Sequence, residues 1–334
     1  MSPLERFRDR AAAHAASLPA EEAIAWIAGH GLLSLAAYPA LRREVAAEVD
    51  GQMRRNLAGN LLRIDGFRRA ADGLGGLPAA PLKGIYLLDT VYRDDPGSRP
   101  MSDLDLLVRS RDVEEAVGRL AAAGFAETAA SRRTGAGWHE RCLAGRGVLL
   151  ELHTRLGIKH APRSSWAELA PVPARVHGRE VHALDAETTL VHLVAHFVKH
   201  GPFLRLGWVE DVLRWAERGV DGARATAIAR RLGALRSLVA GTRALRRAAG
   251  ADLLPGVPDR LGGPAGAAVA LCERAVWRRA AERPFAPPPL GKLRRNAAAL
   301  LLADGPADAL GFVAAKAREL TLRRATPGAV DRGP

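Results

Sequence analysis

The 334-residue sequence has only two cysteines, Cys142 and Cys272, and 130 positions separate them. Neither belongs to a Cys-x-x-Cys pair. This argues against a disulfide framework and against a zinc knuckle, both of which need numerous or closely spaced cysteines. The chain must therefore be stabilised by an ordinary hydrophobic core, and its length is sufficient for one.

Long hydrophobic runs are also missing. No stretch approaches the roughly 18 consecutive apolar residues that a membrane-spanning helix needs. The first residues, MSPLERFRDRAAAH, carry charges of both signs and no apolar signal-peptide core. We therefore expect a cytoplasmic protein without a membrane partner.

Lysine is scarce, because 44 of the 49 basic residues are arginine. Three of the five lysines, Lys83, Lys159 and Lys199, lie in the central part of the chain, where a compact ammonium can be preferred over a guanidinium. From Arg218 onward there are 21 basic and 9 acidic residues, and such a charge could attract nucleic acid. Aromatic residues for base stacking are sparse there, so nucleic acid is the weaker choice of partner.

The periodicity of apolar residues divides the chain into three regions. Residues 1–72 have apolar positions three and four apart and are expected to be helical. In residues 73–184, short runs such as SDLDLLV, RGVLLELHTRL and REVHALD alternate with the helical piece RDVEEAVGRLAAAGF. Residues 185–334 are again helical, beginning with DAETTLVHLVAHFVKHG. The predicted class is α+β, with a small mixed β-sheet core between helical N-terminal and C-terminal regions.

Two acids, Asp103 and Asp105, interrupt the apolar run SDLDLLV. Residues two apart on a strand point to the same face, so their carboxylates project side by side and repel each other unless a cation lies between them. Such a pair can hold one or two Mg²⁺ (or Mn²⁺) ions, which take further ligands from substrate phosphates. A lone Asp-x-Asp can also be a solvated strand end.

A third acid is available in RGVLLELHTRL, where alternation places Glu151 and His153 on one face. Asp-x-Asp on one strand with a third acid on a following strand is the metal site expected for phosphoryl or nucleotidyl transfer. We predict Asp103, Asp105 and Glu151 as catalytic and metal-binding residues, and His153 as a nucleotide contact.

Upstream, Lys83 and Gly84 precede IYLLDTVY, whose spacing is helical. They are expected at a helix N-terminus, where free backbone N–H groups favour phosphate and a glycine permits close approach. The polar loop RDDPGSRP follows, and it would place Arg99 and Ser102 beside the phosphates.

Three histidines, His192, His196 and His200, recur every four residues and would lie along one helix face. Three interpretations remain open: a row of metal ligands, an amphipathic edge with satisfied hydrogen bonds, or a face toward the active-site cleft from which His196, Lys199 or His200 contacts nucleotide or acceptor. We take Lys199 as a further nucleotide-binding candidate.

The segment WVEDVLRW also contains an acid and two aromatic residues. Asp211 could cap a helix, pair with an arginine or act in function. Trp208 and Trp215 are seven residues apart on a helix and are expected in the core.

The order of these motifs, LKG, helix, DPGSRP, SDLDLLV, helix and ELH, resembles the bacterial family of uncharacterised nucleotidyltransferases, in the polymerase-beta-like superfamily. HLVAHFVKHGPFLRLGWVEDVLRW is similar to the helical segment that follows the core in that family. The sequence departs from the superfamily pattern at Lys83-Gly84, where Gly-Ser is common, and at Glu151, where Asp is frequent.

The resemblance implies a nucleotidyltransferase core and a Mg²⁺-dependent enzyme that moves a nucleoside monophosphate from a nucleoside triphosphate such as ATP to an acceptor hydroxyl. The acceptor could be a small molecule, a peptide or a protein. Asp103 and Asp105 would hold the metal, Glu151 would complete the site and help deprotonate the acceptor, and Lys83, Arg99 and Ser102 would neutralise or orient the phosphates.

Two other functions remain open. One is a binding or scaffold protein that keeps the nucleotidyltransferase fold but has lost turnover, which the departures at Lys83-Gly84 and Glu151 would allow. The other is a glycosyltransferase that uses Asp103 and Asp105, which would need a doubly wound α/β domain of about 100 residues before the pair.

Overall fold

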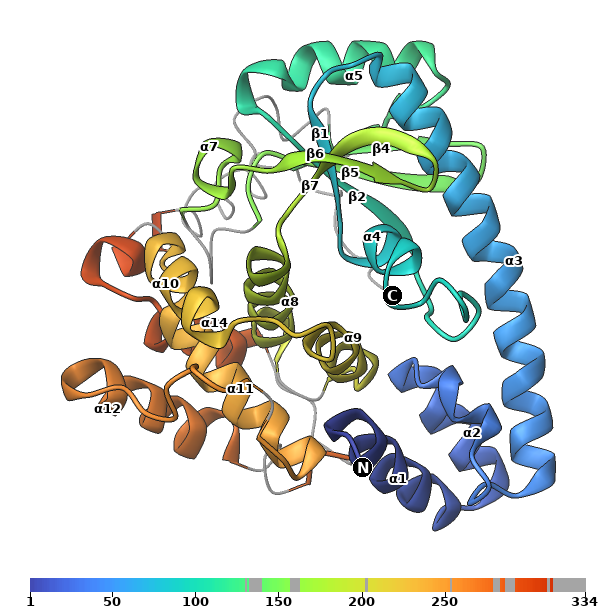
Figure 1. Cartoon of the computed structure of the whole chain (residues 1–334), viewed down its shortest axis with the longest axis vertical. Helices are drawn as coiled ribbons and strands as arrows, with labels where there is room; N and C mark the ends of the chain where they lie inside the picture. Colours follow the sequence, from blue (N-terminus) through green and yellow to red (C-terminus); the bar gives the residue numbers. More distant parts are fainter. Residues whose placement is uncertain are drawn as a thin grey trace.

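The computed structural model describes residues 1–129, 131, 140–156, 163–201, 204–252, 254–278, 283–285, 292–310 and 313–314. Four elements form the N-terminal region: α1 (Pro3–Ala16), α2 (Ala20–His30), the 3₁₀ helix η1 (Leu33–Ala37) and α3 (Arg43–Leu74). Helix α3 is 32 residues long and runs along one side of the molecule, from the N-terminal helices to the sheet (Figure 1). It ends at Gly75, whose φ of 57° is a left-handed conformation that suits glycine.

A five-stranded mixed sheet follows α3. Its strands are β1 (Ala79–Leu82), β2 (Asp103–Val108), β3 (Ala126–Glu127), β4 (Glu140–Gly145) and β5 (Val148–His153). Their spatial order is β1-β2-β5-β4-β3, and the pairing is antiparallel except between β2 and β5. A two-residue loop joins β4 to β5, and both its residues, Arg146 and Gly147, have positive φ, as a type I′ hairpin requires.

Short elements lie around this sheet: α4 (Lys83–Asp89), η2 (Ser110–Asp112), α5 (Val113–Ala122), α7 (Trp166–Leu169), and the hairpin of β6 (Val172–Val176) and β7 (Arg179–Ala183). The apolar residues of β2 and β5 are buried on the sheet face opposite the acids: Leu104, Leu106, Leu150 and Leu152 are at most 1% exposed. This burial holds β2 in place and leaves its other face to polar side chains.

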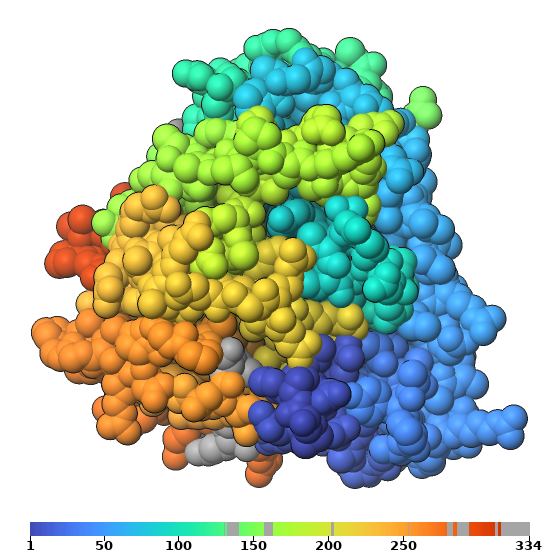
Figure 2. Space-filling model, viewed as in Figure 1, coloured from blue at the N-terminus to red at the C-terminus, as the bar shows by residue number. Residues whose placement is uncertain are grey.

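The C-terminal region is helical: α8 (Ala186–His200), α9 (Gly207–Ala216), α10 (Gly222–Leu232), α11 (Leu235–Ala249), α12 (Gly263–Leu271), the π turn η3 (Cys272–Val276) and α14 (Lys292–Leu301). Asp185 caps α8, since its side chain accepts a hydrogen bond from the N–H of Thr188. The blue N-terminal helices pack against the yellow and orange C-terminal ones (Figure 2), as α1 does against α9 and α11.

The predicted α+β class is therefore confirmed: a mixed sheet lies between helical N-terminal and C-terminal regions. The three predicted segments, 1–72, 73–184 and 185–334, stay a prediction as domain boundaries. None of the described helices combines the length and the apolar character needed to cross a bilayer.

Two asparagines of α3 hold the loop between α4 and β2. Asn60 is fully buried, and its side-chain amide donates to the carbonyls of Pro96 (2.7 Å) and Arg99 (2.9 Å). Asn56 donates to the carbonyl of Gly97 at 2.7 Å. These hydrogen bonds fix the loop that carries Arg99 to the long helix.

We expect Asn60→Ala to lower the free energy of unfolding by about 1–3 kcal/mol, because it leaves two carbonyl acceptors without their donor in a buried site. Urea denaturation measures this difference. Asn56→Ala is the matched control, since it removes a single bond at a half-buried position, and its effect should be smaller. Equal effects of the two variants would contradict this account of the loop.

Candidate active site

Parallel pairing brings the acids of two strands together. Asp105 on β2 lies in register with Glu151 on β5, and Asp103 lies in register with Leu149, so Asp103, Asp105 and Glu151 project from the same sheet face. Asp105 is buried, whereas Asp103 and Glu151 are partly exposed. The carboxylates therefore form a row that begins inside the protein and ends at solvent.

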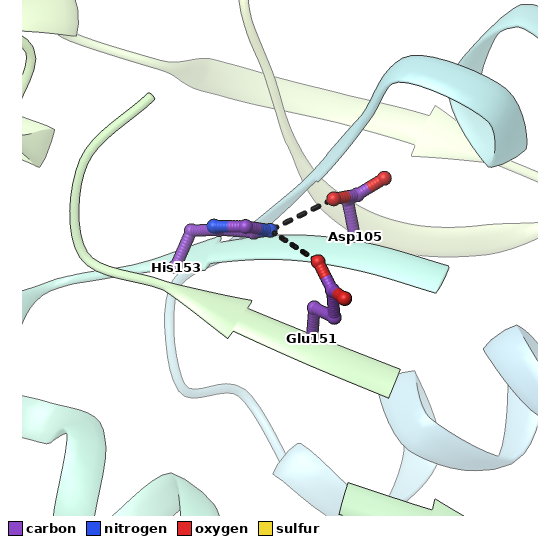
Figure 3. A group of neighbouring side chains, drawn as sticks. All are labelled: Asp105, Glu151 and His153. Carbon is purple, nitrogen blue, oxygen red and sulfur yellow. Dashed lines mark hydrogen bonds and ion pairs between the residues drawn. The ribbon is translucent and has the colours of Figure 1, made fainter. Parts of the chain in front are cut away.

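His153 lies next to this row and points at it (Figure 3). Its Nε2 is 2.8 Å from Oδ1 of Asp105 and 3.5 Å from Oε2 of Glu151. Burial would lower the pKa of His153, but the hydrogen bonds to Asp105 and Glu151 outweigh it and raise the pKa to about 9. At neutral pH His153 is therefore a cation that donates to both acids.

Lys83 contacts the same oxygen from the other side. It lies where β1 ends and α4 begins, and its φ of 45° is in the left-handed region, which is costly for a residue with a side chain. In this conformation its Nζ is 2.5 Å from Oδ1 of Asp105. Burial would raise the pKa of Asp105, but Lys83 and His153 hold it well below its usual value, so Asp105 is ionised.

Asp103 is in the opposite electrostatic situation. Burial raises its pKa, and the neighbouring charges of Asp105 and Glu151 raise it further. A hydrogen bond with Ser102 offsets part of this effect. The charge of Lys83 offsets a larger part, but the pKa of Asp103 stays raised, so a bound cation would stabilise the charged carboxylates at this end of the row.

The donor atoms fit a divalent cation. One ligand atom each from Asp105, Glu151 and His153 lies within 4.8 Å of the other two, and Glu140, Cys142 and Glu151 form a second group by the same measure. Carboxylate oxygens are the ligands that Mg²⁺ prefers. Of the three predicted metal ligands, Asp105 and Glu151 belong to the first group, whereas Asp103 belongs to neither group.

Arg99 is fixed by an acid from a distant helix. Its guanidinium donates from Nε and Nη2 to the two carboxylate oxygens of Asp211 on α9, at 2.9 and 2.8 Å. The hydroxyl of Tyr92 also donates to Asp211, at 2.9 Å. This geometry leaves Nη1 of Arg99 directed toward Gly84.

Glycine is required at position 84 because a side chain has no room there, and not because the backbone conformation demands glycine. A Cβ at this position would lie 2.5 Å from Sδ of Met101 and 2.7 Å from Nη1 of Arg99. Arg99 cannot move aside without breaking its bidentate pair with Asp211. The close approach that the sequence predicted at Gly84 is thus made by protein side chains.

We expect Gly84→Ala to lower the free energy of unfolding by about 1–3 kcal/mol through overpacking, and to displace Arg99. Gly118→Ala is the control, since Gly118 is exposed on α5 and a Cβ there has no neighbour within 4 Å. That variant should be neutral or slightly more stable, because alanine favours a helix. Thermal unfolding of both variants checks the prediction, and a Gly84→Ala protein as stable as wild type would refute it.

These residues surround a cleft of about 430 Å³, a size typical of small-molecule sites. One wall carries Lys83, Gly84, Arg99, Ser102 and the acids of the sheet. The facing wall comes from the C-terminal helices and the segment before α9, and it contributes His196, Lys199, His200, Arg205 and Trp208. The cleft therefore has carboxylates on the sheet side and cations on both sides.

All nine predicted site residues line this cleft: Lys83, Gly84, Arg99, Ser102, Asp103, Asp105, Glu151, His153 and Lys199. Of the three histidines, His196 and His200 reach the cleft, whereas His192 is buried outside it. Burial, followed by the charge of Lys83, lowers the pKa of His192 to about 3. Among the described residues, the three histidines do not form a group that could hold a metal.

Sequence reasoning missed several residues of the cleft. Trp215 is buried as expected. Trp208 is half-buried and packs against the core, as predicted, but it also lines the cleft and packs against His196 and His200. Glu140 and Arg205 were not considered. Glu140 begins strand β4, and an acid at that place was a usable signal, as at Asp103. Arg205 lies within HLVAHFVKHGPFLRLGWVEDVLRW, the segment similar to the family, but no spacing pattern singled it out.

A sheet with acids along one face, bordered by a cleft with cations, is an arrangement typical of phosphate-transferring enzymes. The family model for uncharacterised nucleotidyltransferases matches residues 12–250, and the chain belongs to that family. Nucleotidyl transfer is therefore the general activity that family membership supports. Comparisons with curated proteins and with solved structures give no match.

The glycosyltransferase alternative does not agree with the fold. All of residues 1–102 are described, and before Asp103 they contain one strand, β1, and otherwise helices and turns. A doubly wound α/β domain ahead of the acid pair is thus absent from this part of the chain.

Proposed function

We propose that the protein transfers a nucleoside monophosphate from a nucleoside triphosphate to an acceptor hydroxyl, with Mg²⁺ or Mn²⁺ as the metal. One observation carries the proposal: parallel pairing of β2 and β5 places Asp105 beside Glu151, on a face that borders a cleft of about 430 Å³. Membership of the nucleotidyltransferase family supports the choice of this chemistry over other uses of an acidic cleft.

Asp103, Asp105 and Glu151 would hold the metal. Bound there, a divalent cation would neutralise charge on the triphosphate and favour loss of pyrophosphate. The bond from the acceptor oxygen to the α-phosphorus forms as the bond from that phosphorus to the pyrophosphate oxygen breaks. Glu151 is partly exposed and faces the cleft, so we assign it the proton that the acceptor hydroxyl loses.

The cations of the cleft would bind the triphosphate. Arg99 is already oriented by Asp211, so little entropy is lost when its free Nη1 meets a phosphate oxygen. Lys199 and Arg205 approach from the helical side, and burial lowers the pKa of both. An anionic ligand between the two walls would compensate for the mutual repulsion of these cations.

A second candidate is a nucleotidyltransferase fold without turnover, and the position of Lys83 favours it. An ammonium 2.5 Å from the central aspartate neutralises charge that a metal would otherwise neutralise. In an active enzyme, Lys83 would move from Asp105 to the phosphates when metal and nucleotide bind. In an inactive one it would stay.

Isothermal titration of the protein with a nonhydrolysable ATP analogue, with and without Mg²⁺, tests the proposal. We expect Mg²⁺-dependent affinity in the wild type and its loss in Asp103→Ala/Asp105→Ala. Asp94→Ala is the matched control, an exposed acid in the loop before β2 that should bind like wild type. Glu151→Gln, at a partly exposed position, serves as a second variant if the double variant does not fold.

Binding of the analogue that is the same with and without Mg²⁺ in the wild type would contradict a metal-dependent transferase. If Lys83→Met then restored Mg²⁺-dependent binding, the inactive scaffold would be the correct alternative.

A further inference from the structure

A second cleft, of about 610 Å³, lies in the C-terminal helices, among α11, α12 and η3. It shares no described lining residue with the candidate active site. Helices α11 and α12 lie on the side of the molecule away from the sheet (Figure 1). Five arginines line it: Arg243, Arg247, Arg260, Arg274 and Arg278.

Among the described lining residues the only acid is Glu273, and it is already paired. Oε1 of Glu273 is 2.8 Å from Nε of Arg243. Within the described part of the chain, no carboxylate is close enough to pair with any of the other four arginines. Arg246 on the same helix α11 pairs with Asp252 and Asp259. The hydrogen bond from Arg246 and its charge, followed by the charges of Arg243 and Arg260, lower the pKa of Asp259, so this acid lies near one edge of the cleft. Among the described lining residues, five arginines therefore face a single acid.

Contacts with other helices position the α11 wall of the cleft. Gly241 of α11 packs against Val194 and Val198 of α8, which turns Arg243 and Arg247 away from α8. Nη1 of Arg10 donates to the carbonyl of Arg247 at 2.7 Å and so fixes the end of α11. Arg243 and Arg247 are four residues apart on α11, and like charges at this spacing repel each other and destabilise a helix.

The opposite wall is unusual in its backbone. Glu273 and Arg274 belong to the π turn η3 (Cys272–Val276), which follows α12 directly. Single π turns within helices are uncommon and occur frequently at functional sites. Here the π turn directs the carboxylate of Glu273 to Arg243 while Arg274 stays exposed at the cleft.

The chemistry of the lining selects the ligand. Guanidinium groups bind phosphate oxygens in bidentate geometry, and several of them together suit adjacent phosphates. The described lining residues include apolar ones, such as Leu261 and Val269, but no aromatic ring on which a base could stack. The volume is that of a small-molecule site.

We propose that this cleft binds a small anion with two or more adjacent phosphate groups, at a site separate from the nucleotide cleft. The proposal goes beyond the transferase function and does not depend on it.

Titration calorimetry with inorganic tripolyphosphate on the full-length protein, without metal, tests it. We expect wild-type binding to weaken as salt rises, and Arg247→Glu/Arg274→Glu to weaken it at least tenfold. Arg230→Glu/Arg231→Glu is the control with the same charge change, on exposed residues of α10 outside the cleft, and should stay within twofold of wild type. Lys199→Met, which removes a cation of the nucleotide cleft, reports whether tripolyphosphate binds in that cleft instead.

Several results would overturn the proposal: no binding by the wild type, equal losses in the two double variants, or a loss confined to Lys199→Met. It would also be overturned if the cleft variant lost affinity for a single-stranded RNA oligomer while the wild type ignored tripolyphosphate. Pyrophosphate and ADP titrated in parallel separate the sources of the ligand, since equal affinities indicate a phosphate chain alone and tighter ADP binding indicates a nucleotide.

Discussion

Asp105→Asn is expected to lower the rate of pyrophosphate release from a nucleoside triphosphate by about a thousandfold, equivalent to about 4 kcal/mol of barrier. Asp105 is the central acid of the site. Lys83 and His153 both contact its Oδ1, and Glu151 lies beside it on the neighbouring strand. An asparagine cannot supply the charge that a metal needs. It also leaves two buried cations without their shared anion.

The controls for this prediction separate chemistry from folding. Asp94→Asn, in the exposed loop before β2, should keep wild-type turnover. Thermal unfolding of Asp105→Asn shows whether the protein is still folded at the assay temperature. A folded Asp105→Asn protein with more than a tenth of wild-type turnover would place the reaction elsewhere.

Local pattern was enough to predict much of the fold. Period-2 alternation located β2, β5 and β7, and the cap at Asp185 and the glycine at 201 bounded α8. These features depend on residues near one another in the chain, so the sequence contains them directly. The helix predicted over IYLLDTVY is shorter than expected, since α4 ends at Asp89 and the chain then turns.

Long-range geometry could not be predicted in the same way. That Glu151 lies beside Asp105 depends on parallel pairing of β2 with β5, with β4 outside them, and alternation within one strand does not specify its neighbours. The left-handed conformation of Lys83 places its ammonium on Asp105 and not at a free phosphate site, and no propensity predicts that. Lys159 lies outside the described residues. The catalytic and binding roles of the nine site residues stay predictions.

The pairing of Arg99 with Asp211 joins residues 112 positions apart, and it shows best why the cleft could not be predicted in full. Sequence reasoning placed Arg99 at the phosphates and left Asp211 open between capping, pairing and function. In the structure the two residues form a bidentate ion pair, in which Asp211 of α9 orients Arg99 in the loop before β2.

Asp211→Ala is accordingly expected to lower the free energy of unfolding by roughly 3–5 kcal/mol, because it leaves the Arg99 guanidinium, whose side chain is 12% exposed, without its counter-ion. It also removes the acceptor of the Tyr92 hydroxyl, which stays protonated because burial and then Asp211 raise its pKa well above 10. Urea denaturation measures the loss. Arg179 and Asp72 are the matched control, since they make a bidentate pair of the same geometry on the surface. Asp72→Ala should leave the unfolding midpoint unchanged, because an exposed pair is screened by water and salt.

A double variant then separates the structural contribution of the pair from its contribution to binding. Arg99→Met/Asp211→Leu removes both charges and refills the volume with apolar atoms, so it should recover most of the stability that Asp211→Ala loses. It should still bind the ATP analogue more weakly than wild type, because the oriented guanidinium at Gly84 is gone. Recovery of both stability and nucleotide affinity would mean that Arg99 only supports the fold. Recovery of stability alone would mean that α9 is part of the nucleotide site, acting through the cation it orients.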